Sequence, residues 1–386
     1  MIPGLDGLRG IAFLLVFGIH TEYLGFGWTG VQLFFVLSGF LITGILLDMK
    51  ASLPSKGFFV KFYGRRFLRI FPLYYFYLFA MWAVTFWLYS LEYRRNYMKL
   101  FQSQMPFALA YVYNFFYGSS AFEHHKFVEH FWSLSVEEQF YIFWPLLLFL
   151  VPRKYLKYLF LSLIALGPVL RTALFFAFKY HLVSWFRDEA MWGIYAFPFS
   201  HIDAFAFGAY ISQFSLPKAK QQFYVLAIVV PLIGFTAQFA ATGSFGMWQD
   251  FGYPFSLPRA YQFIWGYSIL NYWFAVTIYA VAREGLFNRF LEMKALKYLG
   301  KISYGLYVYH LAIIWFAGRI RDFLIIEETV AKLLTALIAF IVSLVVASLS
   351  YFLLERPLLN LKERYFSLRP SQEEEGAVPV EKALPG

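Results

Sequence analysis

The stretch TVAKLLTALIAFIVSLVVASLSYFLL, residues Thr329–Leu354, contains one charged side chain, Lys332. Such a run is long enough for a helix that crosses the hydrocarbon core of a bilayer, which needs about 20 predominantly apolar residues. Because no water is available there to satisfy backbone N–H and C=O groups, a continuous apolar run favours a helix over an open strand. This stretch therefore predicts a helical membrane protein.

The composition of the whole chain agrees with this prediction. Of 386 residues, 60% are hydrophobic and 15% are charged, whereas soluble domains have about 25% charged residues. These values exclude a soluble globular enzyme, a disordered chain and a fibrous protein, and the long continuous runs argue against an outer-membrane barrel. The absence of cysteine excludes disulfides, thiol catalysis and iron–sulfur chemistry. We attribute the net charge of +10 to membrane orientation and predict no nucleic-acid partner.

The apolar runs predict an all-α fold, a polytopic transmembrane helical bundle of about ten spans. A further apolar stretch, Gln104–Gly118, is short and contains Pro106 and Asn114, so it is interpreted as an interfacial or re-entrant piece. The predicted spans are Gly10–Tyr23, Val31–Leu47, Ile70–Tyr89, Val136–Val151, Tyr158–Phe178, Tyr195–Phe214, Phe223–Ala241, Tyr261–Ala282, Ile302–Gly318 and Thr329–Leu354.

The distribution of Lys and Arg predicts the orientation of these spans. With the N-terminus inside, 22 of these residues fall in inner loops and 9 in outer loops, so the positive-inside rule places both termini inside. We expect the first apolar run to be a retained span and not a cleaved signal, and Pro357 to end the last helix. The predicted domains are a transmembrane domain over residues 1–366 and a polar, disordered cytoplasmic tail over residues 367–386, with no soluble domain appended.

Two ionisable side chains share one face of the first span. Arg9 and His20 are 11 residues apart, about three helical turns and about 16 Å along the axis, so both point the same way. Ionisable groups inside a bilayer are costly and suggest a functional site. The alternative is an arginine that snorkels to the interface and a histidine bonded to a neighbouring carbonyl.

A predicted inner loop contains three arginines, Arg65, Arg66 and Arg69. On a helix, Arg69 would share a face with Arg65, four residues earlier, and with Arg66, three residues earlier. Guanidinium forks bind phosphate in a bidentate way, so the cluster suits a polyphosphate ligand such as a nucleotide cofactor. Anchoring to anionic lipid is the alternative, and the spacing alone favours it.

A third group of polar residues lies at Phe131–Tyr141. Ser133 or Ser135 is expected to cap a helix whose first turn holds Glu137 and Glu138. At an outer membrane boundary these carboxylates could also orient a histidine or a sugar hydroxyl, or take part in acid–base chemistry.

A fourth group, Ser303, Tyr307 and His310, lies on one helix face at spacings of four and three. His310 is interpreted either as a second histidine in a central cavity or as a partner in an interhelical hydrogen bond. We predict no metal site, because the adjacent His124 and His125 would point apart on a helix.

Six motifs occur in one order along the chain: Leu5–Ala12 with His20, Gly30–Ile42, Arg65–Pro72, Trp132–Tyr141, Ser303–Tyr307 and Glu355–Pro357. In this order they resemble the motifs of the membrane acyltransferase 3 family, including its arginine and histidine separated by ten residues. Gln32 and His201 depart from the residues expected at their positions, which bears on substrate choice and not on the first-span pair.

The resemblance implies transfer of an acyl group, usually acetyl, from cytoplasmic acyl-CoA to a hydroxyl of an extracytoplasmic glycan or related envelope molecule. The implied donor is acetyl-CoA or another acyl-CoA, with no metal, and the implied partners are that donor, a carbohydrate acceptor and the lipid bilayer. We expect the chain in the bacterial cytoplasmic membrane and leave a homo-oligomer open. A transporter of a glycan or lipid-linked intermediate is the alternative function, because polar residues within many spans suit both.

On this resemblance, each candidate site residue has an expected role. His20 is expected to be the general base or an acyl carrier, and Glu137 or Glu138 to orient His20 or the acceptor. The CoA phosphates are expected to bind Arg9, Arg65, Arg66 and Arg69. A central cavity is expected to be lined by Ser38, Ser133, Tyr307 and His310.

Overall fold

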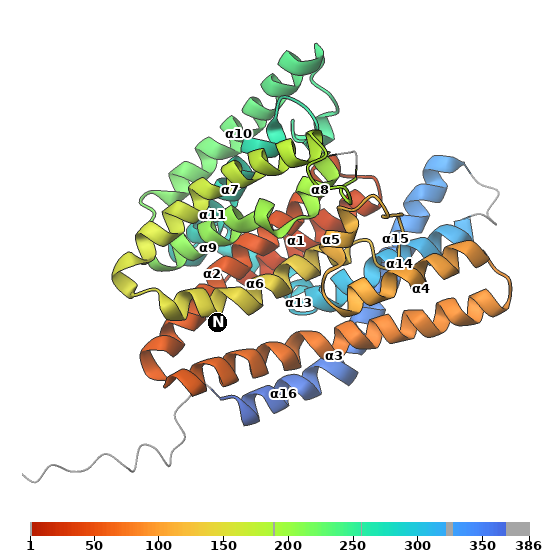
Figure 1. Cartoon of the computed structure of the whole chain (residues 1–386), viewed down its shortest axis with the longest axis horizontal. Helices are drawn as coiled ribbons and strands as arrows, with labels where there is room; N and C mark the ends of the chain where they lie inside the picture. The colour runs from red at the N-terminus through yellow and green to blue at the C-terminus, as the bar shows by residue number, and fades with distance from the viewer. Residues whose placement is uncertain (1, 188–189, 256, 322–326, 368–386) are drawn as a thin grey trace, which may run out of the picture.

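In the computed structural model, which describes residues 2–187, 190–255, 257–321 and 327–367, every regular element is helical (Figure 1). These residues form no strand, and a single isolated bridge joins Ser119 to Phe186. The predicted all-α fold is confirmed for this part of the chain. The helices are α1 Leu5–His20, α2 Thr29–Ser52, α3 Ser55–Ser90, α4 Arg95–Leu109, α5 Tyr113–Tyr117, α6 Phe131–Leu150, α7 Leu156–Lys179, α8 Ala190–Ala196, α9 Ile202–Gln213, α10 Ala219–Thr242, α11 Gln262–Glu284, α12 Asn288–Leu291, α13 Lys294–Lys301, α14 Ser303–Arg321, α15 Glu328–Ser350 and α16 Arg356–Tyr365.

The predicted spans fall on the long helices with one exception. The range Tyr195–Phe214 is divided, because a 3-10 turn at Pro198–His201 separates α8 from α9. The stretch Gln104–Gly118 contains the end of α4 and the short α5. The number of ten spans and the inside position of both termini stay predictions. In the described part of the chain, the helical stretches long and apolar enough to cross a membrane are Gly25–Ser52, Ser55–Ser90, Arg153–Lys179, Ala219–Thr242 and Glu328–Tyr365.

Helix α2 lies at the centre of the bundle. In its most apolar window 72% of the residues are buried inside the protein, against 17–22% for the other four candidate spans, whose exposed apolar faces suit contact with lipid. Helix α2 packs against α9 through two glycines. A Cβ on Gly39 would lie 2.1 Å from the carbonyl oxygen of Phe205, and one on Gly208 would lie 2.0 Å from that of Val36. Small residues allow this close approach of helix backbones in membranes.

Helix α1 meets the basic helix α13 through glycines as well. A Cβ on Gly300 would lie 1.7 Å from the carbonyl oxygen of Asp6, and one on Gly10 would lie 2.7 Å from that of Leu296. The start of α1, which carries Arg9, is therefore held close to α13, the helix that carries Lys294, Lys297 and Lys301.

Helices α3 and α16 run side by side, at the bottom of Figure 1. A Cβ on Gly64 would lie 2.4 Å from the ring of Phe366, just after α16, so the two segments are in direct contact. This packing brings the C-terminal helix onto the arginine cluster of α3.

Two expectations about helix ends are wrong. Helix α6 begins at Phe131, so Ser133 and Ser135 lie inside it and donate to carbonyls of the preceding turn instead of capping the helix. Pro357 does not end the last helix, because α15 continues through a π-helical turn at Tyr351–Glu355 into α16, and Pro357 lies in the first turn of α16. The predicted tail at 367–386 lies, after its first residue, outside the described residues.

Candidate active site

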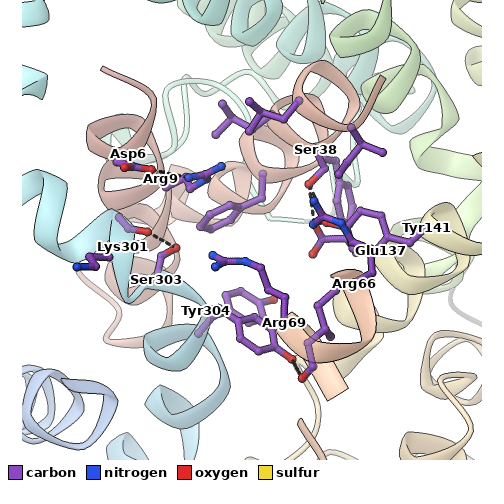
Figure 2. A pocket seen from close by; sticks show the side chains of 18 of the residues that line it. Asp6, Arg9, Ser38, Arg66, Arg69, Glu137, Tyr141, Lys301, Ser303 and Tyr304 are labelled. Carbon is purple, nitrogen blue, oxygen red and sulfur yellow. Dashed lines mark hydrogen bonds and ion pairs between the residues drawn. The ribbon is translucent and has the colours of Figure 1, made fainter. Parts of the chain in front are cut away.

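A cavity of about 1210 Å³ lies among α1, α2, α3, α6, α13 and α14 (Figure 2). The described residues around it include eight basic and four acidic side chains, so the cavity is formally positive and suits an anionic ligand. The basic residues are Arg9, Arg65, Arg66, Arg69, Lys294, Lys297, Lys301 and Lys362, and the acidic residues are Asp6, Glu137, Glu138 and Glu292. The four arginines singled out from the sequence thus surround one cavity.

Arg9 and Arg69 reach this cavity from different helices, α1 and α3, and Figure 2 shows both guanidinium groups pointing into it. Arg9 donates to the Asp6 carboxylate at 2.5 Å, one turn earlier on α1. Arg69 makes no hydrogen bond or ion pair with any residue that the structure describes. Its N–H donors are therefore available to a ligand.

The other two arginines of α3 are engaged with protein groups. Arg65 donates two parallel hydrogen bonds of 3.0 Å to the Glu363 carboxylate and a third, of 2.9 Å, to the carbonyl oxygen of Phe366. The Arg66 guanidinium lies 5.1 Å from the centre of the Tyr141 ring, a cation–π contact. A phosphate that bound Arg65 would compete with a carboxylate, whereas Arg66 would keep its ring contact.

Three of the lining residues form a hydrogen-bonded group on one wall of the cavity. Ser38 of α2 donates from Oγ to Glu137 Oε1 of α6 at 2.6 Å, and the Tyr141 hydroxyl donates to the same oxygen (Figure 2). One oxygen of Glu137 therefore accepts hydrogen bonds from two hydroxyl groups, one from α2 and one from α6 itself. The neighbouring Glu138 has a buried Oε2 without a hydrogen-bond partner among the described residues.

Tyr307 lies at the edge of the cavity and leads to two buried histidines. Its hydroxyl is 2.5 Å from Ser133 Oγ, and its ring centre is 5.5 Å from the ring centres of both His130 and His310. His310 donates from Nδ1 to the carbonyl oxygen of Tyr307 at 2.6 Å, and His130 donates from Nε2 to that of Val308 at 3.1 Å. The other nitrogen of each ring is buried and has no hydrogen-bond partner in the described part of the chain.

His20, the last residue of α1, lies beyond these histidines and not among the described residues that line the cavity. Its ring centre is 5.1 Å from that of His310, which is 5.1 Å from that of His130. The three imidazoles form a cluster, the His20 cluster, that continues from the cavity. No hydrogen bond joins His20 to Glu137 or Glu138 within the described residues.

A different carboxylate acts on the His20 cluster. Glu129, in the loop before α6, accepts hydrogen bonds from Lys126 at 2.7 Å and His124 at 3.2 Å. Burial raises the pKa of Glu129, but these hydrogen bonds and the nearby positive charges outweigh burial and lower the pKa to about 2. Two charged side chains act on His20: the negative Glu129 carboxylate and the positive Lys126 ammonium. Glu129 therefore provides a negative field beside the histidines at neutral pH.

Sequence reasoning missed the lysines of α13 and the role of position 130. Lys294, Lys297 and Lys301 were counted only as inner charges, although their spacing of three and four places them on one helix face. His130 belongs to no recognisable spacing pattern with His20 or His310, because the three residues come from distant parts of the chain.

His124 and His125, in the loop before α6, bond to protein groups. The described residues contain no group of three or more His, Asp or Glu side chains placed to hold a metal ion. His125 instead donates from Nε2 to the carbonyl oxygen of Tyr97 at 3.0 Å.

Comparison with known proteins adds a family and relatives to this geometry. A family model described as an acyltransferase domain matches residues 2–352. The chain is 28% identical to the O-acetyltransferase OatA of Staphylococcus aureus strain MRSA252 over 98% of its length, and 27% identical to the peptidoglycan O-acetyltransferase OatA of Listeria monocytogenes over 92%. It spans 60% and 56% of the lengths of these two relatives. No solved structure gives a significant match.

Proposed function

The chain belongs to the acyltransferase 3 family, and on this premise we propose that it is a membrane O-acyltransferase that uses acyl-CoA as donor and an extracytoplasmic carbohydrate hydroxyl as acceptor. Its relatives are O-acetyltransferases, which supports acetyl as the transferred group. One of them is a peptidoglycan O-acetyltransferase, which supports a cell-envelope glycan as the class of acceptor.

The observation that carries the proposal is the basic cavity. CoA has a diphosphate and a further phosphate at one end and a long, uncharged pantetheine arm that ends in the thioester. The eight basic side chains supply the cations for the phosphates, and Arg9 and Arg69 point into the cavity without sharing a partner. Apolar and aromatic side chains on α2 and α14, such as Phe34 and Tyr304, line the rest and suit the pantetheine arm.

The same cavity suggests the side from which the donor enters. The arginines of α3 and the lysines of α13 belong to segments that the positive-inside rule assigns to the cytoplasmic side. With the five candidate spans, this supports a place in the bacterial cytoplasmic membrane, with the bilayer, acyl-CoA and the carbohydrate as partners. A homo-oligomer is compatible with this arrangement and is not required by it.

In this proposal the His20 cluster performs proton transfer. His20 is the general base for the acceptor hydroxyl, since an imidazole is well matched to proton transfer near neutral pH. The Glu129 carboxylate stabilises the imidazolium that forms. His310 and Tyr307 connect this base to the cavity that holds the donor.

The test is acyl-CoA consumption by the purified protein in liposomes. With acetyl-CoA and fragments of cell-envelope glycan, we expect release of free CoA thiol and an acetylated glycan detected by mass spectrometry. Movement of glycan across the bilayer without thiol release would overturn the proposal and support a transporter. No binding of acetyl-CoA at all would also overturn the acyltransferase.

A further inference from the structure

One serine that lines the basic cavity is hydrogen-bonded to a carboxylate. Among the described residues, the serines that line this cavity are Ser38, Ser133 and Ser303. Ser133 and Ser303 donate to backbone carbonyl oxygens, at 2.9 Å in both cases. Ser38 donates to a carboxylate, Glu137 Oε1, at 2.6 Å. A hydroxyl within hydrogen-bond reach of a carboxylate that can take its proton is the arrangement of an activated nucleophile.

The base of this pair is held in place by a third residue. The Tyr141 hydroxyl donates to the same Glu137 oxygen and lies 3.3 Å from Ser38 Oγ. The ring of Tyr141 in turn packs under the Arg66 guanidinium. The carboxylate thus keeps its orientation toward Ser38, which is what a nucleophile, its base and an orienting group require.

The position of Ser38 separates it from His20. Ser38 is partly exposed and lines the cavity, with Arg9, Arg66 and Arg69 around the same space. His20 lies outside the described lining, beyond His310. An acyl thioester whose phosphates are held by these arginines meets Ser38 before it meets the His20 cluster.

We propose that Ser38 is a catalytic nucleophile that carries the acyl group between donor and acceptor, with Glu137 as its base. This inference rests on the proposed function. Ser38 Oγ attacks the thioester carbonyl carbon, its proton moves to Glu137, the C–S bond breaks, and the CoA thiolate takes the proton from Glu137 and leaves as the thiol. The acceptor hydroxyl then attacks the Ser38 ester carbonyl. Its proton passes through a base to Ser38 Oγ as the ester bond breaks, so the enzyme is restored.

The step predicts exchange chemistry without acceptor. Wild-type protein in liposomes, given acetyl-CoA and isotopically labelled free CoA, should form labelled acetyl-CoA, because the first half-reaction is reversible. Denatured protein should carry one acetyl group on the peptide that contains Ser38, detected by mass spectrometry. Ser38→Ala should lower the exchange rate by about 100-fold or more while acetyl-CoA still binds, and Glu137→Gln should slow it while leaving the site of acetylation unchanged.

Two further variants make the result decisive. Ser38→Cys keeps a nucleophile, so it should accumulate an acetyl thioester that hydroxylamine removes. Ser135 is a buried serine of α6 whose hydroxyl donates to the backbone carbonyl of Phe131, so Ser135→Ala is the matched control and should keep the exchange. Acceptor acetylation by Ser38→Ala at the wild-type rate, or an acetyl group found on His20 instead, would overturn the serine carrier and leave the acyltransferase function standing. Absence of thiol release by the wild type would overturn the function itself.

Discussion

The guanidinium of Arg65 on α3 and the carboxylate of Glu363 on α16 are joined by two parallel hydrogen bonds of 3.0 Å. Arg65 lines the basic cavity, so one of the cations of this cavity is already paired with a carboxylate from the C-terminal helix. The side chain of Glu363 is 60% exposed, and such an ion pair contributes only modestly to stability. A ligand phosphate is therefore able to displace it.

Glu363→Gln should tighten the binding of CoA. Removing the competing carboxylate frees Arg65, and the expected gain is about two- to fivefold in Kd, the equivalent of one exposed ion pair. Calorimetric titration of the detergent-solubilised protein with CoA measures it. Glu328→Gln, which breaks the exposed pair with Lys332 on α15, is the matched control and should leave the Kd unchanged. A weaker or equal affinity in Glu363→Gln would show that Arg65 does not hold a phosphate.

Arg69→Ala should weaken the binding of acyl-CoA strongly. Arg69 points into the cavity and is bound to no described residue. Its removal therefore costs hydrogen bonds to the ligand and none to a described protein group. The loss of a charge-assisted hydrogen bond predicts a Kd higher by about 10- to 100-fold.

The control for this prediction is Arg289→Ala, an exposed arginine that is not among the described lining residues. Repeating the titration with dephospho-CoA identifies the phosphate involved, because the loss disappears if Arg69 binds the missing group. Equal affinity of Arg69→Ala and wild type for acetyl-CoA would contradict the assignment.

His20→Ala should abolish acceptor acetylation without changing the affinity for acyl-CoA. A general base contributes about 10²- to 10⁴-fold to the rate, and His20 does not belong to the described lining of the cavity. The measurement is acetylated glycan formed per unit of protein, together with a CoA titration. His181→Ala, at an exposed loop position, is the control. Normal acetylation by His20→Ala would contradict the role of His20 as general base.

Glu129→Gln should destabilise the protein at neutral pH and less so in acid. The folded pKa of Glu129 is about 2, below its ordinary value of 4.5, so its carboxylate stabilises the fold above about pH 4.5 and loses this effect as the pH falls toward 2. Lys126 and His124 are about half exposed, which limits the expected loss at pH 7 to about 1–2 kcal/mol. Thermal unfolding of both proteins at pH 7 and pH 4 measures the difference, and a gap that widens in acid would contradict it.

Gly39→Ala should destabilise the centre of the bundle. A methyl group at this position of α2 would lie 2.1 Å from the carbonyl oxygen of Phe205, so α9 has to move away, at a cost of about 1–3 kcal/mol. Gly44→Ala, five residues further along the same helix, meets nothing within 4 Å and is the matched control. Thermal melting in detergent should separate the two variants, and equal melting temperatures would show that α2 and α9 are not tightly packed.

The sequence by itself determined the fold class and singled out the arginines of the basic cavity. Apolar runs such as Thr329–Leu354 are local, and a bilayer leaves the helix as the solution for them. Arg65 and Arg69 are one helical turn apart, so their shared direction follows from the chain alone. The first-span pair of Arg9 and His20 followed from the same periodicity.

The tertiary structure decided which of these residues meet. Ser38 and Glu137 are 99 residues apart, and His130 is joined to the carbonyl of Val308 across 178 residues. No local period encodes such pairs, because helix packing in a membrane depends on glycine contacts like that between Gly39 and Phe205 rather than on a hydrophobic stripe. For this reason Glu137 is hydrogen-bonded to a serine of the basic cavity, whereas the sequence suggested His20 or the acceptor as the partner of Glu137 or Glu138.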